Sequence, residues 1–317
     1  MKKLCVIISL LLATNYCAGA ETVKGLVPEA KKIISECLKS SDNQIKANAV
    51  EVVAETGSEE MINDVVALLN DPDITVRFAA AIAMGDMKYT DSREKLEKMT
   101  KDSDLNVATA SSYALYQMGE TKYLKTVEDY ASSNDQTVKA NAVMLLGKAK
   151  DKHALPILYQ LKNDADSTDL VAFGATEAIA RIGDERIYKK VWTMLINVQA
   201  DVRYMGIQSM ASLGGSKGTN AILSMLDDEI TEIRLYAAER LGWLGDKSGQ
   251  SVVLEYFTNP EPTDKLVIDR CNVLAALAIG QIGTEPLTAH LPKLLKNDSP
   301  FVKLAAAKSV FMLDKVR

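Results

Sequence analysis

The sequence has little of what metal centres, disulfide frameworks and membrane spans require. Its 317 residues include two histidines and four cysteines, and aromatic residues make up 6% of them. After residue 20, no apolar stretch reaches the length of about 18 residues that a spanning helix needs. We therefore predict no transmembrane segment. The remaining composition, 47% hydrophobic and 25% charged, is typical of a folded chain with a buried core.

The first twenty residues have the layout of an export signal. Two lysines precede an apolar run over residues 4–13, and small residues surround a predicted cleavage site after Ala20. We predict a signal peptide over 1–20 and an exported protein that is periplasmic or associated with the cell envelope. An alternative is a lipid anchor at Cys17, although the two residues before that cysteine are bulkier than such anchors prefer.

Export also changes the charge of the chain. The net charge of −5 becomes −7 on cleavage, because the leader contains two lysines and no acidic residue. A chain of this charge has no general affinity for polyanions. We therefore expect no nucleic acid among its partners.

Beyond the leader, the sequence repeats with a period of about 31 residues. Six of the eight intervals between equivalent anchor positions are 31 residues long. The anchors are Ile45, Val76, Val107, Val138, Val171, Val202, Ile233, Cys271 and Val302. Four residues after each anchor the side chain is small, and eight after it the side chain is large and apolar. These offsets lie along one stripe of an α-helix, so we predict that each repeat begins with a helix whose stripe is buried.

A turn and a second helix follow in each repeat. A glycine recurs twelve residues after the anchor in six copies, where a left-handed residue can end a helix. These glycines are Gly57, Gly119, Gly183, Gly214, Gly245 and Gly283. Apolar residues recur at offsets 20 and 23, which predicts the second helix. Three residues before the anchor, a short polar side chain can cap the first helix in six copies: Asp42, Asp73, Asp104, Asp135, Thr168 and Ser299.

The repeats predict an all-α fold, a right-handed α-solenoid of about nine two-helix units with about eighteen helices. One hairpin cannot bury its apolar stripes alone, whereas stacked hairpins share a continuous core. The predicted organisation is a short linker over 21–28, then the solenoid over 29–317 with a loop insertion near 259–265. With helices 8–10 Å apart, such layers would form an open rod or arc of roughly 80 Å. We expect its last helix, 302–313, to be a cap with one exposed face.

Two copies carry a recognisable motif. In the second copy, Asp73 precedes Val76-Arg77, a pair of alanines and a Met-Gly step, and the seventh copy has Ile233-Arg234, two alanines, Leu-Gly and Gly-Asp. This pattern resembles the HEAT-like repeats of the phycobilisome-lyase type. The resemblance covers roughly residues 29–317 and implies an α-solenoid. Its family includes scaffolds, adaptors and a few enzymes, so it implies little about activity.

No group of residues has the spacing of a catalytic centre. His153 and His290 are four repeats apart, so in an extended array they cannot share one metal ion. The glycine-rich stretch 213–219 follows a helix rather than a strand and lacks the spacing of a phosphate loop. We predict no enzymatic activity, no cofactor and no metal site.

Charged residues also recur with the repeat. Basic residues follow the anchors directly, and aspartates lie five residues before them: Lys46, Arg77, Lys139, Arg203, Arg234 and Lys303, with Asp71, Asp102, Asp166 and Asp228. They could form an anion-binding track or a ladder of ion pairs between adjacent repeats. Because acidic residues accompany the basic ones, we favour the ladder.

A row of large side chains at offset 21 is the predicted partner site. In copies four to seven this position holds Tyr159, Trp192, Leu223 and Leu254. We expect them on the inner surface of the arc, where Tyr and Trp would anchor a protein or peptide partner. The alternative is ordinary packing between repeats.

Two cysteines remain after cleavage, Cys37 and Cys271. They lie near opposite ends of the predicted array, too far apart for a disulfide. We expect two buried thiols, or alternatively a pairing of Cys37 with another chain.

Together these patterns favour a non-catalytic binding or scaffolding solenoid that presents a concave helical surface to a protein or peptide. Two alternatives remain. A lyase or isomerase similar to the bilin lyases that share the repeat would need an apolar pocket with converging acidic and basic groups. A lipoprotein spacer would be anchored through Cys17.

Overall fold

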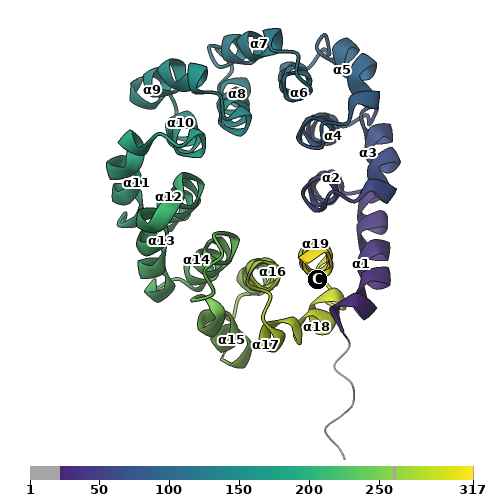
Figure 1. Cartoon of the computed structure of the whole chain (residues 1–317), viewed down its shortest axis with the longest axis vertical. Helices are drawn as coiled ribbons and strands as arrows, with labels where there is room; N and C mark the ends of the chain where they lie inside the picture. Colours follow the sequence, from purple (N-terminus) through teal and green to yellow (C-terminus); the bar gives the residue numbers. More distant parts are fainter. Residues whose placement is uncertain (1–21, 260–261, 317) are drawn as a thin grey trace, which may run out of the picture.

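The structure, a computed structural model, describes residues 22–259 and 262–316, and it is all-helical over that part of the chain. The helices form two concentric layers (Figure 1). In the described residues, nine helices line the inside: α2 (Asn43–Thr56), α4 (Ile74–Asp86), α6 (Leu105–Gln117), α8 (Gln136–Ala149), α10 (Asp169–Ile182), α12 (Ala200–Leu213), α14 (Thr231–Trp243), α16 (Lys265–Ile282) and α19 (Pro300–Val316). Each contains one anchor residue, as predicted.

The outer layer holds the second helix of each unit. It consists of α1 (Val23–Leu38), α3 (Ile62–Leu68), α5 (Arg93–Met99), α7 (Lys122–Tyr130), α9 (Leu155–Asn163), α11 (Tyr188–Leu195), α13 (Gly215–Leu223), α15 (Gln250–Thr258), and the short pair α17 (Glu285–Thr288) and α18 (Leu291–Leu295). Short 3-10 turns lead into several of them. The α-solenoid predicted from the repeat is confirmed.

Five of the six predicted caps and all six turn glycines are confirmed, whereas no capping hydrogen bond from the Ser299 side chain is seen among the described residues of α19. The carboxylates of Asp42, Asp73, Asp104 and Asp135 accept hydrogen bonds from the first amides of their helices, and Thr168 does so with its hydroxyl. All six glycines at offset 12 have positive φ. Glycine adopts this backbone conformation without the strain that a Cβ would cause, which explains its recurrence at the turn.

The solenoid closes into a ring (Figure 1). Helix α19 at the end of the chain packs against α1 at its beginning, as extensively as neighbouring inner helices pack against one another, and it also contacts α2. Lys308 pairs with Glu55, and Lys315 donates to the carbonyl oxygen of Thr56. Helix α1 therefore serves as the outer helix that α19 lacks in sequence, and the two complete one unit across what we call the seam.

Closure corrects three expectations. The chain is not an open rod or arc, because its two terminal half-units are complementary. Helix α19 is not an exposed cap, since it packs against α1 and also buries Leu304, Ala307 and Ser309, which lie outside its anchor stripe. The segment 21–28 is not a linker, because α1 already begins at Val23 and buries its first apolar residues in the seam.

The cysteines are likewise closer in the ring than in a rod. Both are free and buried, Cys37 on α1 and Cys271 on α16, the inner helix next to α19. Burial raises the pKa of the Cys271 thiol to about 12. Cys37 lies in the seam, where burial raises its pKa too, so it is not positioned to pair with another chain.

Small residues let the inner helices approach closely. A Cβ on Gly85 of α4 would lie 2.6 Å from the Cα of Ala114 on α6, and one on Gly280 of α16 would lie 2.8 Å from the Cβ of Ser309 on α19. Any larger residue would push these helices apart. The inner layer is therefore tighter than the outer one, which bends the stack.

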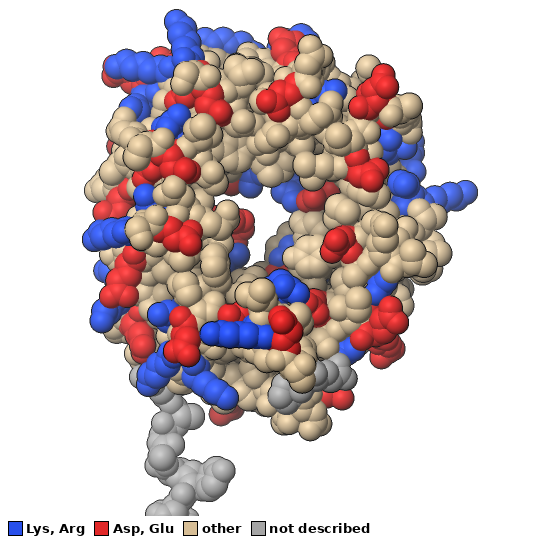
Figure 2. All heavy atoms as spheres, turned by 180° about the vertical axis from the view of Figure 1, so that it is seen from behind, with Lys and Arg blue, Asp and Glu red and all other residues tan. Residues whose placement is uncertain are grey.

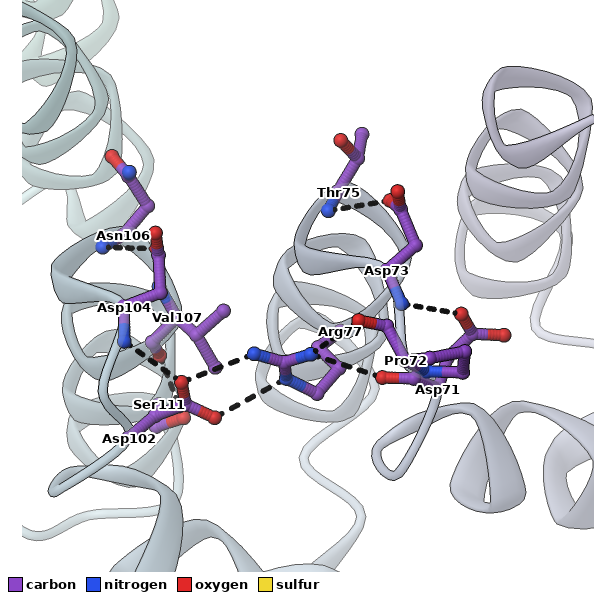
Figure 3. A network of polar contacts seen from close by, with 10 residues as sticks. All are labelled: Asp71, Pro72, Asp73, Thr75, Arg77, Asp102, Asp104, Asn106, Val107 and Ser111. Carbon is purple, nitrogen blue, oxygen red and sulfur yellow. Dashed lines mark hydrogen bonds and ion pairs between the residues drawn. The ribbon is translucent and has the colours of Figure 1, made fainter.

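The predicted ion-pair ladder joins adjacent units. Arg77 forms a two-pronged pair with Asp102 of the next unit at 3.1 and 3.2 Å, while its third nitrogen donates to backbone carbonyls at Asp71 and Pro72 (Figure 3). Arg203 repeats this arrangement with Asp228, and Lys46 makes a single contact with Asp71 of the next unit. Each aspartate also accepts from a nearby backbone amide. These basic side chains are thus already paired within the fold and are not available to bind an anion.

The insertion near 259–265 lengthens an inner helix. Other inner helices begin two residues before their anchor, whereas α16 begins at Lys265, six residues before Cys271. Asp264 caps this additional turn through the amides of Leu266 and Val267. The predicted loop is therefore partly helical, and residues 260–261 lie outside the described part.

The seam can be tested with two aspartates placed on α1. Ile34 is fully buried and Lys32 is exposed. Ile34→Asp should remove about 2–5 kcal/mol of packing at the seam and add a buried charge, so the ring should open. Small-angle X-ray scattering should then report a larger radius of gyration while circular dichroism retains most of the helical signal.

Lys32→Asp is the matched control, because it places the same residue two positions away on the same helix. It should leave the radius of gyration unchanged. A folded Ile34→Asp variant with the wild-type radius would contradict closure through α1.

Candidate functional site

A channel runs through the ring, with positive and negative side chains on its wall (Figure 2). Offsets 2, 6 and 10 lie on the side of each inner helix opposite its buried stripe, so they face this channel. Because the wall is strongly curved, side chains from inner helices that are not neighbours can meet there. Lys148 of α8 reaches across α6 to Asp86 of α4, with Nζ and Oδ2 2.8 Å apart.

Most inner helices contribute to a polar network on the wall, which we call the inner belt. It comprises Glu51, Glu55, Asp86, Tyr113, Lys148, Glu177, Arg181, Gln208, Tyr236, Glu239, Arg240 and Lys308. The hydroxyl of Tyr113 donates to Asp86 at 2.5 Å. Burial and the Asp86 carboxylate hold the pKa of Tyr113 far above its usual range, so this hydroxyl remains a donor.

The belt continues through α10, α12 and α14. The amide of Gln208 donates to Glu177 at 3.2 Å, and its oxygen accepts from Tyr236 and from Arg240. Arg240 also pairs with Glu239, which is almost fully buried. Tyr204 stacks on Tyr236 with ring centroids 3.7 Å apart. The charges of this sector are therefore balanced within the wall itself.

Glu51 of α2 is an exception to that balance. Its side chain reaches the channel, yet the surrounding walls and the nearby Glu55 raise the pKa of its carboxyl group, and Lys308 and Lys148 only partly oppose this. The side chain of Glu51 nevertheless stays exposed to the water of the channel, which screens this effect and keeps it modest. The folded state thus disfavours the ionised form of Glu51.

Replacing Glu51 by glutamine should stabilise the protein at neutral pH. Because the pKa is raised in the folded state, the ionised group costs stability above that pKa, and the cost fades as the pH falls toward the ordinary value of 4.5. Glu51→Gln should raise the melting temperature at pH 7 and have little effect at pH 4. Glu97→Gln, on the exposed face of α5, should change neither; a lower melting temperature for Glu51→Gln at pH 7 would refute this account.

At one mouth of the channel lies a groove of about 1020 Å³, which we call the mouth groove. It is bounded by the N-terminal ends of α12, α14, α16 and α19, and its apolar lining includes Tyr204, Ile230, Leu266, Val273, Leu274 and Phe301. Leu266 is 69% exposed and Phe301 36% exposed. The turn added to α16 by the insertion supplies Leu266, so the one break in the repeat builds a wall of this groove.

The border of the mouth groove is acidic. Asp201, Glu232, Asp269 and Asp298 line it, against Lys265 and Arg270. Arg270 is paired with Glu232, with a nitrogen–oxygen distance of 3.0 Å. This leaves three carboxylates and one ammonium group, so the groove combines an apolar floor with a net negative edge.

Comparisons with known proteins agree with this architecture. Residues 30–116 match a family model described as HEAT repeats. The chain is built from HEAT-like repeats. No curated protein matches its sequence.

The ring also aligns with solved structures, at low sequence identity and with TM-scores below 0.5. Human deoxyhypusine hydroxylase aligns with a TM-score of 0.40 and 16% identity, covering 83% of this chain and 99% of its own. The complex of CpcE and CpcF of phycocyanin lyase from Nostoc sp. aligns with a TM-score of 0.46 and 16% identity, covering 81% and 94%. YibA from E. coli aligns with a TM-score of 0.38 and 17% identity, covering 90% and 97%.

The predicted partner strip lies elsewhere on the HEAT-like ring. Tyr159, Trp192, Leu223 and Leu254 belong to α9, α11, α13 and α15, which form the outer layer (Figure 1). The expectation that they line the inner surface is wrong, because the second helix of every unit faces outward. Leu223, Leu254 and Tyr159 are partly buried against the core, while Trp192 is 40% exposed and stacks on Tyr188.

Sequence reasoning missed the inner belt and the mouth groove. The available signal was the mixture of aromatic and charged residues at offsets 6 and 10 of the first helices. The histidines stay apart: His153 is exposed beside Asp151, and His290 stacks on Phe257. Over the described residues, no helix is long and apolar enough to span a membrane, and no group of His, Cys, Asp and Glu could hold a metal ion.

Proposed function

We propose that this HEAT-like ring is an exported, non-catalytic binding or scaffolding protein that holds a protein or peptide at the mouth of its channel. The mouth groove is the observation that carries the proposal. It is an open groove of about 1020 Å³ with an apolar floor and charged groups at its edge, and exposed apolar surfaces rimmed by polar residues mark interaction sites. The inner concave surface thus takes the role that an open arc would have offered.

Capture from an envelope extract tests this function. The tagged ring should retain a partner, and Leu266→Ala combined with Phe301→Ala should abolish retention because both residues supply exposed apolar surface. Leu170→Ala is the control, since Leu170 is 64% exposed near the start of α10 but lies outside the groove.

Two results would redirect the proposal. Loss of the partner with Trp192→Ala alone would move the site to the outer layer. A coloured or fluorescent small molecule that co-purifies with the ring would favour the lyase or isomerase alternative.

The proposed export has a separate test. Cleavage after Ala20 would leave Glu21 and Thr22 before α1, so the mature chain would keep the helix that closes the ring. The intact mass of the exported protein should correspond to a first residue of Glu21. A mass that corresponds to an acylated Cys17 would instead support the lipoprotein spacer.

A further inference from the structure

The edge of the mouth groove carries a net negative charge. Three of its carboxylates, Asp201, Asp269 and Asp298, have no ion-pair partner among the described residues, whereas Glu232 is already paired with Arg270. A ligand that buries apolar groups on the floor brings its remaining groups against this edge. Opposite charge favours such a complex, and like charge disfavours it.

The positions of the acidic residues relative to the helix ends are a second observation. Four inner helices begin around the groove, and the first turns of α12 and α14 carry Asp201 and Glu232. Asp269 lies one turn further along α16, whose first turn holds no acidic residue. Carboxylates in a first turn also stabilise their own helices, so a single acidic residue at that position needs no ligand to account for it. Asp298 lies outside a helix, in the loop that leads into α19. Its contribution to the edge is therefore not explained by helix stability.

The apolar floor is also assembled by an irregular feature. Leu266 lies in the turn that the insertion adds to α16, which regular units lack, and it faces the same groove as Phe301 near the start of α19. Two large exposed side chains that face one groove suit the apolar face of an amphipathic segment.

We propose, on the basis of the binding function above, that the mouth groove takes a cationic amphipathic peptide segment. Apolar side chains of the segment contact Leu266, Val273 and Phe301, and its lysine or arginine side chains pair with Asp201, Asp269 and Asp298. The segment belongs to another protein and lies across the ends of α12, α14, α16 and α19.

Matched peptides test the charge preference. Two labelled amphipathic peptides share the same apolar residues and carry lysine or glutamate at every polar position. Fluorescence anisotropy with the intact ring should show at least about tenfold tighter binding of the lysine peptide. Its affinity should fall with added salt as screening weakens the ion pairs. Equal affinities for the two peptides would overturn the proposal.

Variants test the location. Leu266→Ala should weaken the lysine peptide about tenfold, whereas Leu170→Ala should not change its affinity. Asp201→Asn with Asp298→Asn should weaken it and flatten its salt dependence. Asp169→Asn, an acid in the first turn of α10 outside the groove, should not. Equal effects of groove and control variants would overturn the assignment.

Two other occupants of the mouth groove would each give a distinct experimental result. A ring dimer in sedimentation analysis that dissociates on Leu266→Ala would assign the groove to a second copy. A tightly bound acyl lipid in the purified protein would assign it to a lipid. Either result overturns the peptide proposal. Failure of the lysine peptide to bind also overturns it, while retention of a partner from the envelope extract would leave the broader binding function standing.

Discussion

The close approach of the inner helices is the constraint on which the rest of the structure depends. Gly85 meets Ala114 and Gly280 meets Ser309 at distances that leave no room for a larger side chain. The outer helices of adjacent units contact one another far less than the inner helices do, so the units are wedge-shaped and the chain bends at their junctions. Nine units in the described chain close a circle when each contributes about 40°. The small residues therefore set not only local packing but also the ring.

Closure changes the energetics of a repeat protein. In an open solenoid the end units have one neighbour and expose an apolar face, so dedicated caps are needed. Here α1 and α19 cover each other, and their buried residues, among them Ile34 and Val310, join the same continuous core. Helix α19 also lines the mouth groove. The helix that completes the ring is thus one of those that a bound partner would contact.

The sequence predicts local structure well and curvature poorly. The anchors, the capping aspartates, the turn glycines and the pairs such as Arg77 with Asp102 all follow from contacts within one unit or between neighbours. Closure depends on many small rotations that add up over the chain, and no single residue reports them. One clue was available: a lone second helix precedes Asn43, and a lone first helix follows Ser299. Each half-unit was the missing part of the other. The prediction that the strip at Trp192 lies on the inner surface failed for a related reason. Offset 21 indicates which face of the second helix the residues share, but not toward which side the stack bends.

The inner wall divides into two sectors. In one, the charged groups are paired within the wall; in the other, apolar surface is exposed. Through most of the channel, charged groups meet their partners within the belt, as Asp86 does with Lys148 and Tyr113. A ligand there would have to replace contacts that already exist, which limits its net gain. Helix α16 departs from this pattern, because it supplies no residue of the belt and its Val273 and Leu274 line the mouth groove instead. Apolar surface at Leu266 and Val273 has no such partner to give up, and water leaves it favourably. Binding is therefore assigned to the sector around α16 rather than to the more conspicuous charges of the channel.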